Sequence, residues 1–587
     1  MRTLPRVDVV IIGGGWTGLL MAKELGSRTS LNVVVLERGG PREPHQYLTD
    51  MDELDYAIRL RMMQDASKET ITLRHDPKQR ALPVRKLGSF LPGTGIGGAG
   101  EHWQGWCPRF SPDSFEIRTR TIEKYGAQRL PEDCDIRDWG ITYQDLEPYY
   151  TRAENLIGVS GKAGNLKGKT GPGGDPFDGP HSAEYPNPPM KMPHLAEMFR
   201  IATTSIGLHP FPVPAATISE PYTNPDGVHR LGCVYCGYCE RFGCMIGAKA
   251  QPTNTLLPVI AKQKNVTIRS HSIARRILCN NDPKAQHAKG VSYTNERGEA
   301  IFQPADLVIL SSWTLNNTRL LLLSNIGTPY DPVARKGTLG RHLTHQVSTG
   351  ANGFFDEPLN RFMGAGASCI MLSDYDADNF NHENLNFLRG GKLAAVASGA
   401  RPIANFGVVP QSVKSRWGSE WKKAAIHWYD RVGAVIFEGE HMSYTGNFMD
   451  LDPTYKDWLG DPLLRFTLNW RDNERNMSDF GNAKAVEMLR AMGAVETATD
   501  GRLQNYDCRS YQATHIQGGT TMGTSPENSV LNPWLQHWDV SNLFVLGASS
   551  FPQNASGNPT LTILAQTYRT TEAIVERYLQ KPGPICG

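Results

Sequence analysis

Long hydrophobic runs are missing from this sequence. No stretch approaches the roughly 18 consecutive apolar residues that a membrane-spanning helix needs, so we expect no transmembrane segment. A secretory signal is missing as well, because Arg2 and Arg6 lead directly into a strand that the fold needs. Taken by themselves, these two absences predict a cytoplasmic protein.

An excess of charge of one sign is also missing. The 587 residues include 61 Lys and Arg against 59 Asp and Glu, a net charge of +2. This balance is too near neutral to indicate nucleic acid or an anionic membrane surface as the main partner, so we expect neither. Internal repeats and low-complexity tracts are absent too. A hydrophobic content of 40% with 20% charged residues is typical of a globular protein, and the length allows two or more cores.

Cysteines are few, ten in 587 residues, yet four of them stand within twelve residues. They follow the spacing C-x2-C-x2-C-x4-C and are Cys233, Cys236, Cys239 and Cys244. A chain of this size needs no disulfide framework, so the crowding favours a metal site. The spacing is close to the ferredoxin-like C-x2-C-x2-C run and predicts an iron–sulfur cluster, of either the [3Fe-4S] or the [4Fe-4S] type. Structural zinc and, in an exported protein, disulfides are the alternatives.

The start of the chain carries the pattern of a dinucleotide-binding unit. The apolar run 7–12 is typical of a strand, and Gly13, Gly15 and Gly18 follow it as G-x-G-x-x-G before a helical segment. Gly13 would make the tight turn and Gly15 would let backbone approach a pyrophosphate. Gly18 would let the helix lie close to the strand. We therefore predict that a dinucleotide binds here.

Other strands of the same sheet are spread along the chain. The strand-like run 32–36 ends at Glu37, nineteen residues beyond Gly18, where a carboxylate can accept hydrogen bonds from an adenosine ribose. Further strand-like runs occupy 306–310 and 543–546. We expect a sheet assembled from distant segments.

The intervening stretches have a different character. Residues 162–193 are rich in Gly, Pro, Lys and Asn and predict a long surface excursion. From about 350 to 501, short strand-like runs such as 432–437 alternate with Gly- and Asn-rich loops. We interpret this stretch as a second, substrate-facing domain inserted into the first. The amphipathic segment 562–579 predicts the closing helix of the first domain.

Residues 93–103 form a second glycine-rich segment, with Gly95, Gly97, Gly98 and Gly100. It has too many glycines for a helix and too few polar turn residues for a plain loop, so we predict backbone pressed against a flat ligand. A third small-residue segment follows the last strand, with Gly547 and Ala548. Together these segments favour FAD over NAD, because an extended flavin dinucleotide is bound at both ends.

At this point the chain resembles the glucose-methanol-choline (GMC) flavin oxidoreductases, and within them the flavoprotein subunits of membrane-associated bacterial sugar and sugar-acid dehydrogenases. The matching segments cover nearly the whole chain and are the first strand–helix–strand unit, 93–110, the cysteine run, 305–327, 339–342 and 514–577. The resemblance implies an α/β protein (α+β overall), similar to pyranose oxidase. Its Rossmann-like FAD-binding domain would contain an inserted substrate domain built on an antiparallel sheet.

We accordingly expect five segments. The FAD-binding domain would comprise 1–130, 226–345 with the cysteine run, and 501–587 with the active site. Residues 131–225 would contain the excursion and part of the substrate domain, and residues 346–500 would form its main part.

The resemblance also implies roles for individual residues. His102 matches the histidine that carries the flavin covalently in related enzymes; a histidine that merely stacks or hydrogen-bonds beside the flavin is the alternative. Val266 lies in a segment similar to the strand whose backbone contacts adenine. Pro559 and Thr560 begin a helix whose N–H groups would stabilise a reduced, anionic flavin.

His515 and Asn558 resemble the active-site pair of the family. Alcohol oxidation requires removal of the O–H proton as hydride leaves the carbon, and a histidine with a pKa near neutrality suits that task. His515 would therefore be the general base. Asn558 would hydrogen-bond the reacting oxygen and direct the C–H bond toward the flavin.

The implied function is an FAD-dependent dehydrogenase that oxidises a secondary hydroxyl of a sugar acid or sugar, with gluconate oxidised at C2 favoured. A glucoside 3-dehydrogenase is a close alternative. An oxygen-using sugar oxidase and a non-enzymatic electron-relay flavoprotein are more distant ones.

The resemblance further implies partners and a location. Electrons would pass through the iron–sulfur cluster to a cytochrome c subunit or a soluble cytochrome c. A small subunit with a twin-arginine signal would export the folded flavoprotein, which would then lie in the periplasm, associated with the inner membrane. This location opposes the cytoplasmic one that the sequence predicts by itself.

Overall fold

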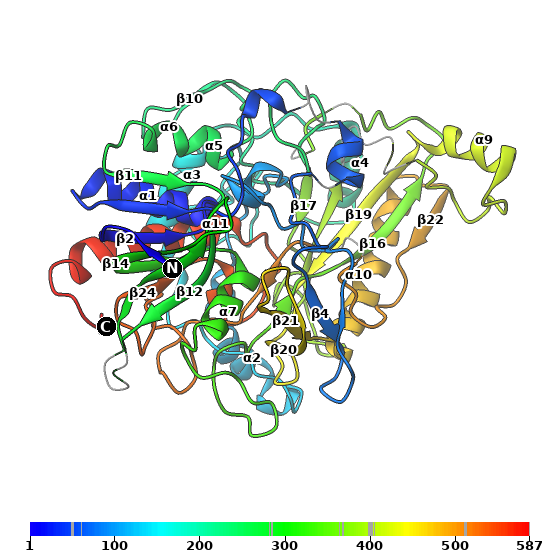
Figure 1. Cartoon of the computed structure of the whole chain (residues 1–587). Coiled ribbons are helices and arrows are strands. Elements are labelled where there is room, and N and C mark those ends of the chain that lie inside the picture. Colours follow the sequence, from blue (N-terminus) through cyan, green and yellow to red (C-terminus); the bar gives the residue numbers. More distant parts are fainter. Residues whose placement is uncertain are drawn as a thin grey trace.

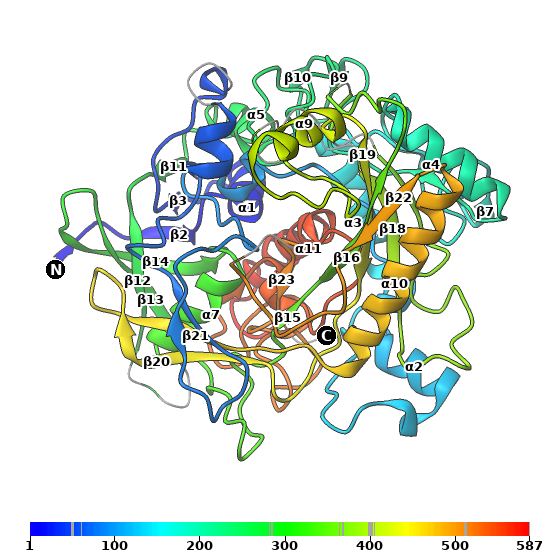
Figure 2. The same cartoon turned by 90° about the vertical axis from the view of Figure 1, so that its right-hand side faces the viewer.

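The computed structural model describes residues 1–47, 52–59, 61–280, 282, 286–362, 364–366, 369–396, 403, 406–509 and 513–585. Two large sheets lie side by side in it, a mainly parallel one formed by early, middle and late segments and an antiparallel one formed by the region in between (Figures 1 and 2). This arrangement confirms the expected α/β fold class with an antiparallel second sheet.

The first sheet, eight-stranded over the described residues, has the order β11-β3-β2-β14-β13-β12, with β1 and β24 also paired to β14. Its strands are β1 (Arg2–Thr3), β2 (Val7–Ile12), β3 (Val33–Leu36), β11 (Val266–Arg269), β12 (Ile273–Cys279), β13 (Ala288–Thr294), β14 (Ala300–Leu310) and β24 (Leu543–Val545). The continuous apolar runs suit strands that are covered on both faces. The four strands expected from sequence near residues 7, 33, 306 and 543 are confirmed, and they pair in parallel.

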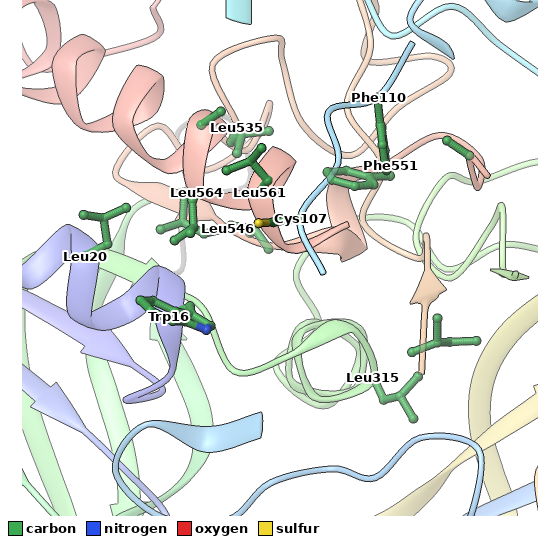
Figure 3. Close-up of a cluster of buried hydrophobic side chains, with 14 of the residues drawn as sticks. Trp16, Leu20, Cys107, Phe110, Leu315, Leu535, Leu546, Phe551, Leu561 and Leu564 are labelled. Carbon is green, nitrogen blue, oxygen red and sulfur yellow. The ribbon is translucent and has the colours of Figure 1, made fainter. Parts of the chain in front are cut away.

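Helices α1 (Trp16–Arg28), α3 (Tyr143–Ile157), α7 (Thr314–Leu323) and α11 (Thr560–Ala573) cover this sheet. Helix α1 packs against both β3 and α11, and α3 packs against α11. Figure 3 shows the resulting core, in which Leu20 of α1 and Leu564 of α11 lie near Leu546 at the end of the last strand. The closing helix is thus confirmed, although its last part, Ile574–Tyr578, is a π-helical turn.

The second sheet is antiparallel and has the order β22-β16-β19-β18-β17-β8. Its strands are β8 (Phe211–Pro212), β16 (Val347–Phe354), β17 (Ile370–Leu372), β18 (Gly391–Val396), β19 (Val432–Gly439) and β22 (Glu496–Thr499). Helix α10 (Asp472–Ala491) packs along one face, where it contacts β16, β19 and β22 (Figure 2). Val435 and Phe437 of β19 belong to the same buried cluster as Met477 of α10. Ile436, between them in sequence, packs instead in a second cluster with Trp106.

A third sheet joins an early and a late part of the chain. It contains β20 (Phe448–Lys456), β21 (Pro462–Thr467), β4 (Ile71–Arg74) and β5 (Leu82–Pro83). Strands β21 and β4 run parallel, and Figures 1 and 2 both place them side by side. The five-segment division stays a prediction, because strand pairing alone defines no domain boundary.

The remaining described helices and strands are α2 (Ile117–Tyr125), α4 (His194–Ser205), α5 (Pro252–Thr255), α6 (Leu257–Ile260), α9 (Gly418–Trp428), β6 (Asn165–Leu166) with β7 (Lys169–Thr170), β9 (Tyr222–Thr223) with β10 (His229–Arg230), and β15 (Thr344–His345) with β23 (Ile516–Gln517). Helix α9 projects from the edge of the molecule (Figure 1). None of the helices formed by the described residues has both the length and the apolar character that crossing a bilayer requires.

The stretch 162–193 is only partly the surface excursion that its composition predicts. Asp175 and His181 are buried, and the carboxylate of Asp175 accepts a hydrogen bond of 2.6 Å from the hydroxyl of Ser373. The backbone N–H of His181 donates to the carbonyl of Asn165. Composition does not reveal this burial, because the hydrogen-bond partner of Asp175 is 198 residues away in the sequence.

Candidate functional site

A cavity of about 330 Å³ lies at the carboxyl ends of the parallel strands. The residues that follow β2, β3, β14 and β24 line it: Gly13, Glu37, Ser311 and Leu546. Ligands of open α/β sheets bind at this edge. Glu438 of β19 contributes to the wall as well, so the cavity extends from the first sheet to the second.

The three glycines after β2 differ in what surrounds them. Gly13 has a φ of +106°, and a Cβ there would lie 2.5 Å from the carbonyl oxygen of Ser311. A Cβ on Gly18 would lie 2.0 Å from the carbonyl oxygen of Gly13. A Cβ on Gly15 would meet only the carbonyl oxygen of Gly97, at 3.9 Å. Gly13 and Gly18 therefore serve the turn and the helix packing, whereas Gly15 leaves room beside the cavity that it lines.

Helix α1 begins directly after this turn. Gly15 is its N-cap, without a side-chain hydrogen bond, and the first turn has no acidic residue. The first N–H groups of a helix lack intrahelical partners and favour an anion. This end of the cavity therefore suits a phosphate group.

The carboxylate of Glu37 is bonded to backbone from three loops. It accepts hydrogen bonds from the N–H groups of Gly14 at 2.8 Å, Gly39 at 2.8 Å and Gly95 at 3.2 Å. Burial raises the pKa of Glu37, and these hydrogen bonds lower it. Because an ionised carboxylate has about four acceptor positions, one remains for a ligand. The predicted ribose contact stays a prediction.

The second glycine segment lies directly against the first. The N–H of Gly97 donates to the carbonyl of Gly14 at 2.7 Å. Gly97 and Gly98 have φ values of +96° and +56° and both line the cavity. A Cβ on Gly100 would lie 2.5 Å from the indole nitrogen of Trp16, which explains the need for glycine there.

His102 follows this segment and is buried in the cavity wall. Its Nε2 lies 3.1 Å from the carbonyl oxygen of Leu91 and 2.9 Å from the sulfur of Met63, and its Nδ1 lies 3.1 Å from the carbonyl oxygen of Ala99. Burial lowers the pKa of His102 to about 3, with a further contribution from Lys249. The ring is therefore neutral near pH 7, the form that is nucleophilic. Its covalent bond to flavin stays a prediction.

The late segments close the cavity on another side. Gly547 and Ala548 line it, and so do Pro559 and Thr560, where α11 begins. Gly547 has a φ of +101° with open space where a Cβ would be. Val266, in contrast, is a residue of β11 beside Val33, outside the cavity lining. The wall near β3 comes from the start of β12, at Ile273 and Ala274.

His515 and Asn558 meet in the cavity wall. The amide nitrogen of Asn558 lies 3.0 Å from Nε2 of His515, and Nδ1 of His515 faces Oε1 of Gln346. An amide NH₂ only donates and an amide oxygen only accepts, so the proton of the neutral ring is on Nδ1, and the lone pair of Nε2 accepts a hydrogen bond from the amide of Asn558. Burial lowers the pKa of His515 to about 3, with a further contribution from His345.

The amide oxygen of Asn558 is buried and has no hydrogen-bond partner among the described residues. An acceptor oxygen thus stands beside a basic nitrogen in the same wall. A hydroxyl group on a ligand could donate to this oxygen, or to Nε2 where it displaces the amide N–H of Asn558. The sequence-predicted pair is therefore brought together in the structure, and its catalytic role is taken up below.

Gln346 is a site residue that sequence reasoning missed. It lies between β15 and β16, 169 residues from His515 along the chain. Its amide nitrogen donates to the carbonyl of Ala555 at 3.3 Å, which fixes the orientation of its oxygen. The only sequence signal is its position just after the Leu339-Gly-Arg-His segment.

The cysteine run lies beside the second glycine segment. The backbone N–H of Arg241 donates to the carbonyl of His102 at 2.8 Å, and Glu240 and Arg241 line the cavity. Cys239 is buried in one cluster with Trp106, another cavity residue. The run therefore adjoins the cavity.

The described structure places Cys233, Cys236 and Cys244 in no disulfide bond. Burial, together with the other three cysteines of the run, raises the pKa of Cys233 to about 12, so the four sulfurs lie close to one another. Over the residues described, no three His, Cys, Asp or Glu side chains are arranged to bind a metal ion. The iron–sulfur cluster thus stays a prediction.

Comparison with known proteins places these features in context. Residues 227–347 match the N-terminal family model of the GMC oxidoreductases, and residues 443–567 match the C-terminal one. The gluconate 2-dehydrogenase flavoprotein of Pantoea cypripedii is 40% identical over 99% of this chain and 95% of its own length. The fructose dehydrogenase large subunit of Gluconobacter japonicus is 25% identical over 97% of each chain.

Among solved structures, pyridoxine 4-oxidase from Mesorbium loti has a TM-score of 0.61 with 16% sequence identity, covering 97% of this chain and 100% of its own. At that identity the likeness concerns the fold alone. It agrees with the mixed α/β architecture of several sheets described above.

Proposed function

The chain belongs to the GMC oxidoreductase family and is an FAD-dependent dehydrogenase of CH–OH donors, and from that premise we propose that it oxidises gluconate at C2. The substrate is supported by the 40% identical relative named for that reaction. The observation that carries the proposal is the pair His515 and Asn558, with the Nε2 lone pair in the wall of the cavity.

The cavity fits FAD on the chemistry of its walls. Gly15 and Gly547 leave open space where other residues would place a Cβ. Two helices, α1 and α11, begin at the cavity without acidic residues in their first turns. When bound, FAD would supply the acceptor for the hydrogen that leaves the carbinol carbon with its electron pair.

The residues of this chain supply the proton chemistry and the positioning. His515 would accept the hydroxyl proton at Nε2, because burial keeps its ring neutral and Gln346 keeps the Nδ1 proton on the far side. Asn558 would hydrogen-bond the reacting oxygen through its amide group. A positioned general base contributes about 10²- to 10⁴-fold in rate. The first N–H groups of α11 would favour negative charge at their end of the cavity.

The cysteine run is proposed to bind an iron–sulfur cluster through Cys233, Cys236, Cys239 and Cys244. The spacing supports this assignment, and so does the contact between the run and the glycine segment at His102. Such a cluster would supply one-electron steps toward a cytochrome c-type acceptor. A small twin-arginine-exported subunit and a periplasmic location at the inner membrane complete the proposal.

One anaerobic experiment tests the substrate and the cofactors together. The absorption spectrum of the purified protein should show flavin and iron–sulfur bands, and gluconate should bleach the flavin. Reduction by lactose or trehalose with no response to gluconate would favour a glucoside 3-dehydrogenase instead. Stoichiometric hydrogen peroxide in air would favour an oxidase, and no bleaching by any sugar would remove the enzymatic role.

A further inference from the structure

Glu438 is a buried carboxyl group in the wall of the cavity that contains His515. Its side chain belongs to β19 of the second sheet and is 6% exposed. Its Oε2 is buried and has no hydrogen-bond partner anywhere in the described part of the chain. Buried carboxylate oxygens are costly without a partner. A polar group that enters the cavity would therefore be the partner of Oε2.

Strand register places Glu438 on the side of the sheet that faces the cavity. Ile436, two residues earlier, packs with Trp106 of the cavity wall, whereas Phe437 packs with α10 on the opposite face. Across the sheet, Glu438 is paired with Ser348 of β16. Ser348 is two residues beyond Gln346, whose side chain contacts His515. The carboxyl thus borders the same cavity as the proposed base but comes from the antiparallel sheet.

A buried lysine stands behind this carboxyl. Lys392 of β18 is the register partner of Glu438 on its other side and is 4% exposed. Its Nζ lies 3.8 Å from Oδ2 of Asp376 and is also attracted by the charge of Asp175. Burial raises the pKa of Glu438 to about 7, and Lys392 lowers it. Because paired residues share a face of the sheet, Lys392 lies on the same face as the carboxyl, and its charge favours the ionised form of Glu438.

We propose that Glu438 determines substrate specificity by hydrogen-bonding a hydroxyl group of the substrate other than the one oxidised. The inference rests on the proposed function, because it takes the substrate to be polyhydroxylated. Two acceptor atoms without partners among the described residues, Oε2 of Glu438 in β19 and Oδ1 of Asn558 just before α11, border one cavity. A monohydric alcohol would donate to one of them and leave the other unpaired, which a polyol avoids.

The test combines variants of Glu438 with substrates that lack single hydroxyls. The holoenzyme and the variants Glu438→Gln and Glu438→Leu are assayed with D-gluconate and its 3-, 4-, 5- and 6-deoxy analogues. For the unsubstituted enzyme, removal of one particular hydroxyl should lower kcat/KM by about 10- to 100-fold. Glu438→Leu should lower kcat/KM for gluconate by about the same factor. In that variant, the analogue that lacks this hydroxyl should react with the same kcat/KM as gluconate. Glu438→Gln should fall between the two.

The KM and kcat values separate this role from a structural one. In the Glu438 variants, the rate of flavin reduction at saturating gluconate should stay within about threefold of that of the unsubstituted enzyme. The fall in kcat/KM should therefore come from a higher KM. Glu474→Gln is the matched control, because Glu474 is also buried but accepts hydrogen bonds from the hydroxyl of Tyr444 at 2.9 and 3.1 Å, away from the cavity. FAD content and melting temperature show whether each variant is folded. If Glu438→Leu is not folded, the isosteric Glu438→Gln alone tests the proposal.

The possible failures are distinguishable. If gluconate bleaches the flavin of the unsubstituted enzyme but the Glu438 variants keep its kcat/KM and its losses with every deoxy analogue, the inference is overturned and the proposed function stands. If gluconate does not bleach the flavin at all, the proposed function is overturned and the inference with it.

Discussion

The backbone N–H of Arg241 donates to the carbonyl oxygen of His102 at 2.8 Å. Lys249 strengthens this junction, because its Nζ donates to the carbonyl oxygens of Trp103 at 2.6 Å, Phe242 at 2.7 Å and Cys239 at 2.8 Å. Two of these acceptors belong to the cysteine run and one to the glycine segment. The two segments therefore form one packed unit, and a redox centre in the run would lie close to a bound flavin.

From this contact we expect cysteine variants to slow electron transfer to cytochrome c without slowing flavin reduction by the substrate. Cys236→Ser removes an exposed thiol of the run. We expect unchanged bleaching of the flavin by gluconate but a loss of at least about tenfold in the rate of cytochrome c reduction, with lower iron content. Stopped-flow absorption and iron analysis measure both. Cys279→Ser, outside the run, is the control and should change neither. Equal cytochrome c reduction in the two variants would contradict the relay.

Replacing His515 tests the base. His515→Ala should lower the rate of flavin bleaching by gluconate by about 10²- to 10⁴-fold, because it removes the proposed general base. FAD content should stay the same. His537→Ala is the control, since His537 is buried but lies outside the cavity lining. Unchanged bleaching kinetics in His515→Ala would refute the assignment.

The pH dependence of the base follows from its burial. A histidine in water loses its proton near pH 6.5, whereas burial lowers the pKa of His515 to about 3. The basic form exists above the pKa, so its rate contribution should be lost only as the pH falls toward 3. We expect kcat/KM for flavin reduction to show no inflection near pH 6.5 that comes from His515. Such an inflection, present also in Glu438→Gln, would contradict this expectation.

The fold and much of the site follow from local sequence patterns. The strand–turn–helix around Gly13 and Gly18 was predictable because a tight turn and a close helix contact require glycine within a few residues. The pair His515 and Asn558 was found by family resemblance. Gln346 and Glu438 were not found, because each acts across a sheet or from a distant loop and has no local pattern. Val266 lies outside the cavity lining, which includes Ala274 of the next strand, and its contact with the cofactor stays a prediction.

The two glycines at the start of α1 should respond differently to alanine. Gly15→Ala creates no close contact with protein, since the nearest atom would be 3.9 Å from the Cβ. We expect the melting temperature of the apoprotein to be unchanged and FAD binding to weaken by about tenfold or more, because the methyl group meets the ligand. Gly18→Ala would place a Cβ 2.0 Å from the carbonyl of Gly13 and should cost about 1–3 kcal/mol of stability.

Thermal unfolding of the apoproteins and titration with FAD measure these effects. Full FAD affinity in Gly15→Ala would show that the cofactor does not approach this turn.

The last prediction concerns the bond between His102 and the flavin. Two features of the structure favour attachment: the ring lies in the cavity wall, and burial lowers its pKa to about 3, so that a nitrogen lone pair is available near pH 7. Protein precipitated with acid should therefore stay yellow, whereas His102→Ala should bind FAD but release it into the supernatant. The absorbance of pellet and supernatant measures the distribution. A colourless pellet from the unsubstituted protein would leave His102 as a neighbour of the flavin only, because denaturation releases any cofactor bound without a covalent bond.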